Sequence, residues 1–286
     1  MLAITGATGQ LGQATIAALL TKVAPDQLVA LARDPQKATT LQQQGVHVRQ
    51  GDYNDVASLV AAFQGIATVL LISGNDMAAR TQQHRNVIDA AKQAGVQHVV
   101  YTSMLNPSTT SAFIASPSHV ATEAHLLASG LTYTLLRNAL YLDLVPMLVG
   151  KDALPSGRFY FAAGTGQASF ALRSEIAEAL ASVLTTPGHQ GQTYDIAPAP
   201  AYSMQDVATT LSEVSGQSVA YVPVSSEDMA TAMHQKHIPA HMVELVVSMA
   251  RAMASNEFNA TSPAFEQLLG RKPTDLKTYL TTVYAR

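Results

Sequence analysis

The sequence predicts a doubly wound α/β protein, in which helices cover both faces of a parallel sheet and a smaller α/β lobe lies towards the C-terminus. Short apolar runs alternate with longer helical patterns from the first residues onward. The runs are continuously apolar, as expected for parallel strands that are buried on both faces. A chain of 286 residues with 48% hydrophobic and 13% charged residues is able to bury such a core.

The first half of the chain supplies the alternating elements in order. The expected strands cover residues 2–5, 28–32, 46–48, 68–72, 98–101 and 131–136. The expected helices cover residues 11–22, 36–43, 56–63, 80–94 and 118–129. Gly45, Gly95 and Gly130 each follow a helical pattern and precede a strand, where a helix commonly ends on a left-handed residue.

After residue 137 the pattern loosens. A helix at 174–184 and a strand at 193–196 are expected to return to the first sheet. A helix at 203–216 and a strand at 219–222 are expected to belong to the other lobe. We therefore expect a dinucleotide-binding domain made of residues 1–137 plus about 171–197. The remainder, about 138–170 plus 198–286, is expected to form a substrate-binding lobe.

Composition argues against several classes of protein. A net charge of −3, from 17 basic and 20 acidic residues, offers no basic footprint for nucleic acid or for an anionic membrane surface. The chain has no cysteine, so thiolate metal sites and cysteine nucleophiles are excluded. No apolar run approaches the roughly 20 residues of a membrane span, and the first strand begins too early for a signal peptide. We expect a cytoplasmic protein.

The first turn carries the clearest motif. Residues 6–12, Gly-Ala-Thr-Gly-Gln-Leu-Gly, follow the first strand and open the first helix. There, Gly6 permits the tight turn, Gly9 lets the backbone approach a pyrophosphate, and Gly12 lets the helix pack against the strand. The start of the helix adds unpaired N–H groups for the anion. The motif predicts a Rossmann-like dinucleotide site; an ordinary glycine-rich turn is the alternative.

The ends of the second and third strands bear on cofactor choice. The acidic residue that commonly binds a ribose 2′-hydroxyl is missing, and Arg33 stands in its place. An arginine accommodates a 2′-phosphate, so NADP(H) is expected in preference to NAD(H); alternatively, Arg33 pairs with Asp34 in solvent. Asp52 follows the third strand and either accepts a hydrogen bond from adenine or caps the helix that begins near Asp55.

Several segments together resemble the NmrA-like branch of the atypical short-chain dehydrogenase/reductases, and in particular its bacterial quinone-reducing members. The segments are residues 6–9, 33–35, 70–73, 84–88, 101–103, 119–123, 133–138, 191–194 and 269–271. The resemblance covers nearly the whole chain and implies a Rossmann-like fold with NADP(H) across the strand ends. The cofactor contacts that it implies are Gly6, Ala7, Thr8, Gly9, Gln10, Leu11, Arg33, Ser73, Gly74, Asn75, Arg137, Asn138, Tyr141 and Leu142.

The proton donor used by standard members of that superfamily is missing. Ser103 is present, but Ala115 occupies the tyrosine position and His119 the lysine position. Reduction of an ordinary ketone is therefore disfavoured, whereas a quinone needs mainly alignment with the nicotinamide. His119 either assists weakly or is bonded to a local carbonyl or to Glu123. Tyr141 either stacks on a flat ring or packs in the core.

These observations favour an enzyme: an NADPH-dependent oxidoreductase that transfers hydride to a quinone or a similar flat acceptor, without a Tyr-Lys pair, flavin or metal. The main alternative is a regulator that binds NADP without turning it over, and a sugar epimerase or reductase of the same fold is less favoured. His234, His237 and His241 have helical spacing, but Pro239 interrupts them. A small molecule is the expected partner, and the chain is either monomeric or a homo-oligomer.

Overall fold

A seven-stranded parallel sheet organises the N-terminal two thirds of the protein. The computed structural model describes residues 1–285. The strands pair in the order β11-β6-β5-β4-β1-β2-β3, which confirms the doubly wound fold class. The strands are β1 Leu2–Ile4, β2 Leu28–Ala32, β3 His47–Gln50, β4 Thr68–Leu71, β5 His98–Met104, β6 Thr132–Asn138 and β11 Gln192–Ile196.

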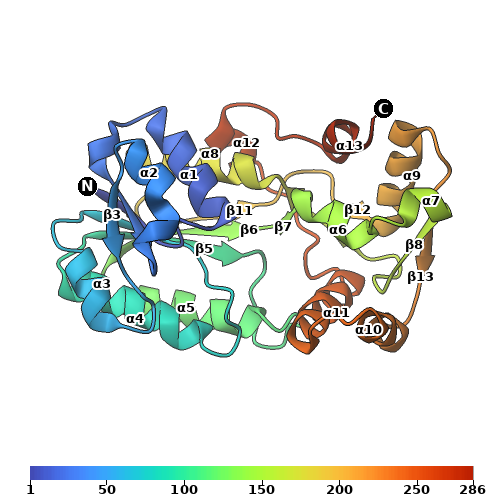
Figure 1. The fold of residues 1–286 in the computed structure, drawn as a ribbon, viewed down its shortest axis with the longest axis horizontal. Helices are drawn as coiled ribbons and strands as arrows, with labels where there is room; N and C mark the ends of the chain where they lie inside the picture. The colour runs from blue at the N-terminus through green and yellow to red at the C-terminus, as the bar shows by residue number, and fades with distance from the viewer. Residues whose placement is uncertain (286) are drawn as a thin grey trace.

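Helices cover both faces of this sheet (Figure 1). One layer consists of α3 Val56–Ala62, α4 Arg80–Gln93 and α5 Ser116–Ala128. The opposite layer consists of α1 Gln10–Leu20, α2 Thr39–Gln43, α8 Arg173–Thr185 and α12 Ala264–Leu269. Alternate residues of one strand enter different cores: Val69 and Leu71 pack towards α3–α5, whereas Leu70 packs towards α1 and α8. This two-sided burial explains why the inner strands β1, β2 and β4 are almost entirely apolar, whereas the edge strands β3 and β11 are not.

The local signals in the sequence are largely confirmed. Gly45, Gly95 and Gly130 have φ values of 86°, 79° and 80°, as expected where a left-handed residue ends a helix. The helix expected over 36–43 is divided. Asp34 caps a 3₁₀ turn over Pro35–Ala38, and α2 begins only at Thr39.

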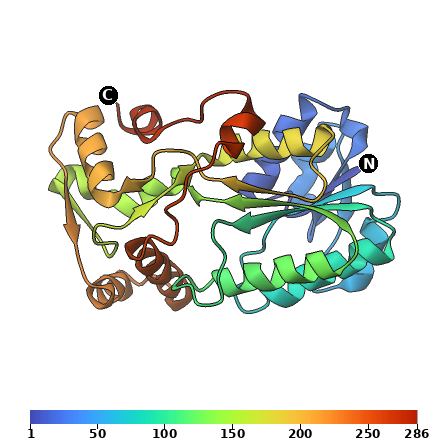
Figure 2. The same cartoon turned by 180° about the vertical axis from the view of Figure 1, so that it is seen from behind.

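The smaller lobe lies beyond the carboxyl ends of the strands, as both views of the ribbon show (Figures 1 and 2). Its helices are α6 Val145–Val149, α7 Ala153–Ser156, α9 Met204–Ser215, α10 Ser226–Gln235, α11 Ala240–Ala254 and α13 Leu276–Tyr284. Its strands form three pairs: β7 Leu140–Tyr141 with β10 Phe170–Ala171, β8 Arg158–Phe161 with β13 Ala220–Pro223, and β9 Gln167–Ala168 with β12 Tyr202–Ser203.

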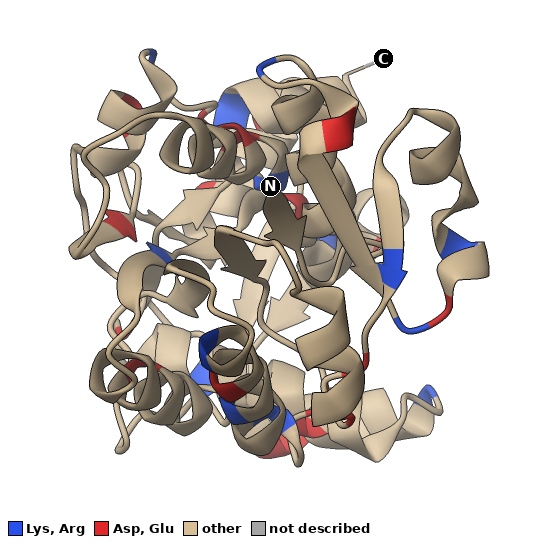
Figure 3. Ribbon diagram, turned by 90° about the vertical axis from the view of Figure 1, so that its left-hand side faces the viewer, with Lys and Arg blue, Asp and Glu red and all other residues tan. Residues whose placement is uncertain are grey.

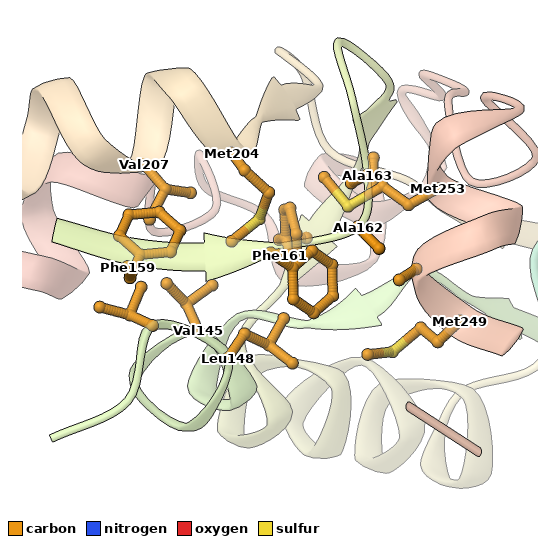
Figure 4. Packing of buried hydrophobic residues seen from close by; sticks show 14 of the residues in the cluster. Val145, Leu148, Phe159, Phe161, Ala162, Ala163, Met204, Val207, Met249 and Met253 are labelled. Carbon is orange, nitrogen blue, oxygen red and sulfur yellow. The ribbon is translucent and has the colours of Figure 1, made fainter. Parts of the chain in front are cut away.

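Aromatic and sulfur-containing side chains fill the core of this lobe. Figure 4 shows Met204 and Met253 pointing towards the region around Phe161 and Ala163. Met249 and Met253 are 6% and 1% exposed, so they serve as packing residues. The methionine-rich C-terminal segment therefore stabilises the lobe.

The chain crosses between the two cores more than once. Strand β11 pairs with β6, as expected for a segment that returns to the first sheet. Helix α12, far beyond that return, also packs against α8 and β11, and its Phe265 is fully buried there. The division into two domains stays a prediction. The packing of α12 against α8 and β11 places a late segment of the chain beside the first sheet.

Charged side chains are interspersed along the elements in the view from the sheet end (Figure 3). Within residues 1–285, no helix is long and apolar enough to cross a membrane.

The packing of α12 generates a stability prediction. Phe265→Ala removes a fully buried ring between α12 and the sheet, so we expect the free energy of unfolding to fall by about 3–5 kcal/mol. Leu127→Ala, at a side chain that is 52% exposed, is the matched control and should change stability by less than about 0.5 kcal/mol. Urea unfolding measures both, and equal small effects would contradict the observed packing of α12.

Candidate active site at the carboxyl ends of the strands

The turn after β1 has the geometry that its glycines predict. Gly6 has φ of +59°, a conformation that side chains rarely adopt. A Cβ on Gly12 would lie 2.3 Å from the backbone oxygen of Gly6, so α1 approaches the turn too closely for any other residue. Gly6 and Gly12 therefore have the turning and packing roles expected from the sequence.

The start of α1 is open. Gly9 is its N-cap residue, and no side chain within residues 1–285 caps the helix. Asp55, Ser203, Ser225 and Asp275 accept hydrogen bonds at the starts of α3, α9, α10 and α13, whereas α4, α5, α8 and α11 lack a side-chain cap, as α1 does. A Cβ on Gly9 would meet only the oxygen of Gly6, at 3.3 Å. The first turn of α1 thus presents N–H groups without a side-chain acceptor, the arrangement that binds an anion.

Arg33 lies at the end of β2 and is exposed. It makes no ion pair with any carboxylate of the described chain, and Asp34 instead accepts a hydrogen bond from the backbone of Gln36 at 3.0 Å. The alternative in which Arg33 pairs with Asp34 is therefore wrong. The side chain of Arg33 is left free to meet a ligand.

Asp52 lies at the end of β3, and its carboxylate accepts from the backbone N–H of Asn54 at 2.9 Å. The N-cap of α3 is Asp55, which accepts from the N–H of Ser58 at 3.1 Å. The alternative in which Asp52 caps this helix is wrong, because Asp55 stands directly before it. A contact between Asp52 and adenine stays a prediction.

Tyr53, which the sequence did not single out, holds the two central strands together where they end. Its hydroxyl bonds to Thr5 and donates to the carbonyl of Ile72 at 3.0 Å, and the N–H of Ile72 donates to the Thr5 hydroxyl at 3.0 Å. Burial raises the pKa of Tyr53, so the phenol stays protonated. Hydrogen bonds between uncharged groups therefore hold the carboxyl ends of β1 and β4 in place relative to each other.

The segment after β4 is fixed by its backbone. Ser73 donates its N–H to the hydroxyl of Thr102, and Gly74 donates its N–H to Nε2 of His84, both at 3.0 Å. Nδ1 of His84 lies 2.9 Å from the hydroxyl of Thr122. Because Nε2 accepts, Nδ1 carries the proton and donates to Thr122. This places Ser73 and Gly74 at the strand ends, with Asn75 exposed beside them.

The residues that end β6 differ in their surroundings. Arg137 binds Glu123 through Nε and Nη2, at 3.0 and 2.6 Å, and Ser103 donates to the same carboxylate at 2.6 Å. Both amide atoms of Asn138 are buried and make no well-formed hydrogen bond within residues 1–285, although a weaker side-chain contact with Tyr141 opposes the rise in the pKa of that phenol. Arg137 is therefore occupied by a protein carboxylate, and the hydroxyl of Ser103 donates to the same carboxylate.

Tyr141 and Leu142 follow β6. Leu142 is buried in the core of the smaller lobe. The guanidinium of Arg173 lies 4.4 Å from the centre of the Tyr141 ring and pairs with Asp143. Tyr141 therefore packs beneath a cation rather than standing free.

His119 lies in the first turn of α5 and is 5% exposed. Its Nδ1 is 2.6 Å from the hydroxyl of Tyr101, and its Nε2 is 3.5 Å from Nη1 of Arg80. The alternative partners, a local carbonyl or Glu123, are therefore wrong. No local pattern near His119 indicates its true partners, because they come from β5 and α4.

Burial keeps His84 and His119 neutral. Burial, and then the nearby charge of Arg80, lowers the pKa of His84 and of His119 to about 3. His119 is consequently not an imidazolium at neutral pH and has no readily released proton there. His119 is therefore a neutral imidazole in this site.

The three histidines of the C-terminal segment do not share one helix face. Helix α10 ends at Gln235, and His237 has φ of 57° in the turn before α11. No group of three potential ligands that would hold a metal ion occurs among residues 1–285.

Comparison with known proteins gives the family. A model described as the NmrA-like family matches residues 1–284. Quinone oxidoreductase 2 of Escherichia coli is 39% identical over 96% of each chain. A crystal structure of the E. coli NADPH-dependent quinone oxidoreductase with NADPH superimposes with a TM-score of 0.93 at 38% identity, covering 99% of this chain and all of that one.

A Citrobacter triphenylmethane reductase structure with NADP(H) superimposes equally well, with a TM-score of 0.93 at 37% identity over 99% of this chain and all of that one. The resemblance noted in the sequence is thereby confirmed. Since the family model spans almost every residue and these relatives match from end to end, the chain belongs to the NmrA-like family.

Proposed function

We propose that this protein is an NADPH-dependent oxidoreductase that transfers hydride to a quinone or a similar flat, electrophilic acceptor, without a tyrosine-lysine pair. The observation that carries the proposal is an uncapped, glycine-rich anion site at the start of α1. Two buried histidines of the neighbouring helices, His84 of α4 and His119 of α5, are neutral. The names of the relatives, an NADPH-dependent quinone oxidoreductase and a triphenylmethane reductase bound to NADP(H), support it.

The residues present fit a dinucleotide. The free N–H groups at the start of α1 would bind the pyrophosphate, and Gly9 leaves room for its close approach. The side chain of Arg33 makes no ion pair within residues 1–285 and would bind a 2′-phosphate. The buried amide of Asn138, which makes no well-formed hydrogen bond within residues 1–285, would be satisfied by a donor and acceptor on the nicotinamide half. When bound, NADPH supplies the hydride.

The identity of the hydride acceptor is inferred from the weak acidity of the side chains in the site. His119 is neutral, and Ser103 is bonded to Glu123, so neither offers a strong acid to an alcohol oxygen. A quinone carbonyl is already electron-poor, and its reduced form takes protons from water. The protein would then contribute alignment and the exclusion of water.

A binding and turnover assay separates the enzyme from a sensor. We expect NADPH to be oxidised when a panel of quinones is added, with turnover that saturates in both substrates. Tight binding of NADPH with no turnover for any quinone, azo compound or dye would favour the regulator instead.

The cofactor turn is tested by Gly9→Val. The variant should fold, because Gly9 has φ of −82° and ψ of 167°, which a β-branched residue adopts readily. We expect it to lose NADPH binding, since the branched side chain fills the space of the pyrophosphate. Ala17→Val, at an exposed position of the same helix, is the control and should bind normally. Calorimetric titration with NADPH gives both affinities, and unchanged affinity in folded Gly9→Val would refute the cofactor assignment.

The preference for NADPH is tested by Arg33→Ala. Loss of a charge-assisted bond to the 2′-phosphate should weaken NADPH binding by about 1–3 kcal/mol and leave NADH binding nearly unchanged. Lys37→Ala removes a neighbouring exposed cation and serves as the control. Equal weakening of the two cofactors would show that Arg33 has a structural role.

The role of His119 is tested by His119→Gln and by the pH profile. Because burial and Arg80 hold the pKa of His119 near 3, the residue does not titrate in the neutral range. We expect kcat with a quinone to be nearly flat between about pH 6 and 8 and to be largely retained in the variant. A general acid would instead lose about a hundredfold or more, and a steep wild-type pH dependence that vanishes in His119→Gln would contradict this prediction.

A further inference from the structure

Arg80 is the only arginine among the buried residues of the described chain, and it is 5% exposed. Its Nε has no hydrogen-bond partner, and its guanidinium makes no ion pair within residues 1–285. Arg137, Arg173, Arg251 and Arg271 all pair with carboxylates. A buried cation without a counter-ion is costly, so its retention needs a reason other than stability.

The neighbours of Arg80 compensate its charge only in part, because burial lowers the pKa of Arg80 and the exposed carboxylate of Asp76 is the charge that opposes this fall. His119 approaches Nη1 at 3.5 Å and is neutral, and so is His84. Burial keeps Tyr101 protonated. The carboxylate of Asp76 is exposed and accepts from the backbone N–H of Ala79 at 3.1 Å. One positive charge therefore persists in a low-dielectric environment, where its field acts strongly.

Arg80 lies near residues that are expected to contact the cofactor. It is the first residue of α4, five positions after Asn75. His84 accepts from the N–H of Gly74, and burial, and then the charge of Arg80, lowers the pKa of this histidine. Burial raises the pKa of Tyr141 beyond β6, and Arg173, a hydrogen bond with the Asn138 side chain and Arg80 oppose that rise. The charge of Arg80 therefore acts on both the segment after β4 and the residues that follow β6.

We propose, resting on the proposed function, that Arg80 selects acceptors by charge: it favours neutral acceptors that become anionic on reduction and disfavours cationic ones. A quinone that gains a hydride becomes a hydroquinone monoanion, which takes one proton from water, while the nicotinamide is oxidised to NADP⁺. A triphenylmethane dye is a carbocation, and the hydride forms a C–H bond at its central carbon to give a neutral product.

The two acceptors respond oppositely to one fixed positive charge. Negative charge that develops on the quinone oxygen is stabilised in the transition state relative to free enzyme and substrate, so kcat/KM rises. The dye is still partly cationic in its transition state and is repelled, so kcat/KM falls. Arg80 is therefore a specificity-determining residue.

The experiment compares kcat/KM for 1,4-naphthoquinone and for malachite green in the wild type, Arg80→Met, Arg80→Lys and Arg85→Gln. We expect Arg80→Met to lose at least about tenfold with the quinone, and to keep or gain activity with the dye. Arg80→Lys should retain most of the quinone preference, because the charge remains. Arg85→Gln, at an exposed arginine of the same helix, is the control and should leave both rates unchanged.

Binding without turnover gives an independent test. The anion of 2-hydroxy-1,4-naphthoquinone, titrated into the protein saturated with NADP⁺, should bind more weakly to Arg80→Met than to the wild type. Neutral 1,4-naphthoquinone should bind both alike. If no acceptor is reduced by the wild type, the proposed function fails, but this titration still decides the role of Arg80.

Measurements of stability and of NADPH affinity distinguish the proposed role of Arg80 from a structural or a cofactor-binding role. Thermal unfolding should show Arg80→Met at least as stable as the wild type, since an uncompensated buried charge is removed; a variant that does not fold would overturn the inference by making Arg80 structural. Parallel losses with quinone and dye, or weaker NADPH binding that accounts for the lost activity, would overturn it by assigning Arg80 to the cofactor.

Discussion

The pairing of β1 with both β2 and β4 is the constraint on which the site depends. The strand order reverses at β1, so the connections that follow β1 and β4 leave in opposite directions, which is the point where doubly wound sheets bind ligands. The glycine turn follows β1, and the segment that begins with Ser73 follows β4. Tyr53 and Thr5 tie the two strands together at this point.

Two arginines near β5 and β6, the half-buried Arg137 and the buried Arg80, show how differently charge is used. Glu123, which is 6% exposed, is matched by Arg137 and Ser103, and this network joins α5 to the ends of β5 and β6. Arg80 makes no ion pair within residues 1–285, and its charge adds to the burial that keeps His84 and His119 neutral. The first arrangement stabilises the scaffold, whereas the second leaves an electrostatic field for the site.

Hydrogen bonds from neutral groups position the backbone around this field. His84 accepts from Gly74 and donates to Thr122, so it joins the segment after β4 to α5. Because its pKa is about 3, this link does not break when the pH varies around neutrality. The proposed hydride transfer without an acid would benefit from such a framework, since alignment would be the protein's main contribution.

The sequence by itself determined the parallel sheet, the order of its first six strands along the chain, the return of β11 and the glycine turn, because each depends on residues a few positions apart. It also placed Asp34 after β2 and Asp52 after β3. The alternatives of an ion pair between Arg33 and Asp34 and of Asp52 as the cap of α3 were wrong. Only the tertiary structure decided the packing of Phe265 against the sheet, the bridge made by Tyr53, and the contact of His119 with Arg80 across 39 positions. Burial and pairing of such side chains arise when distant segments fold together, and no local pattern in the sequence records them.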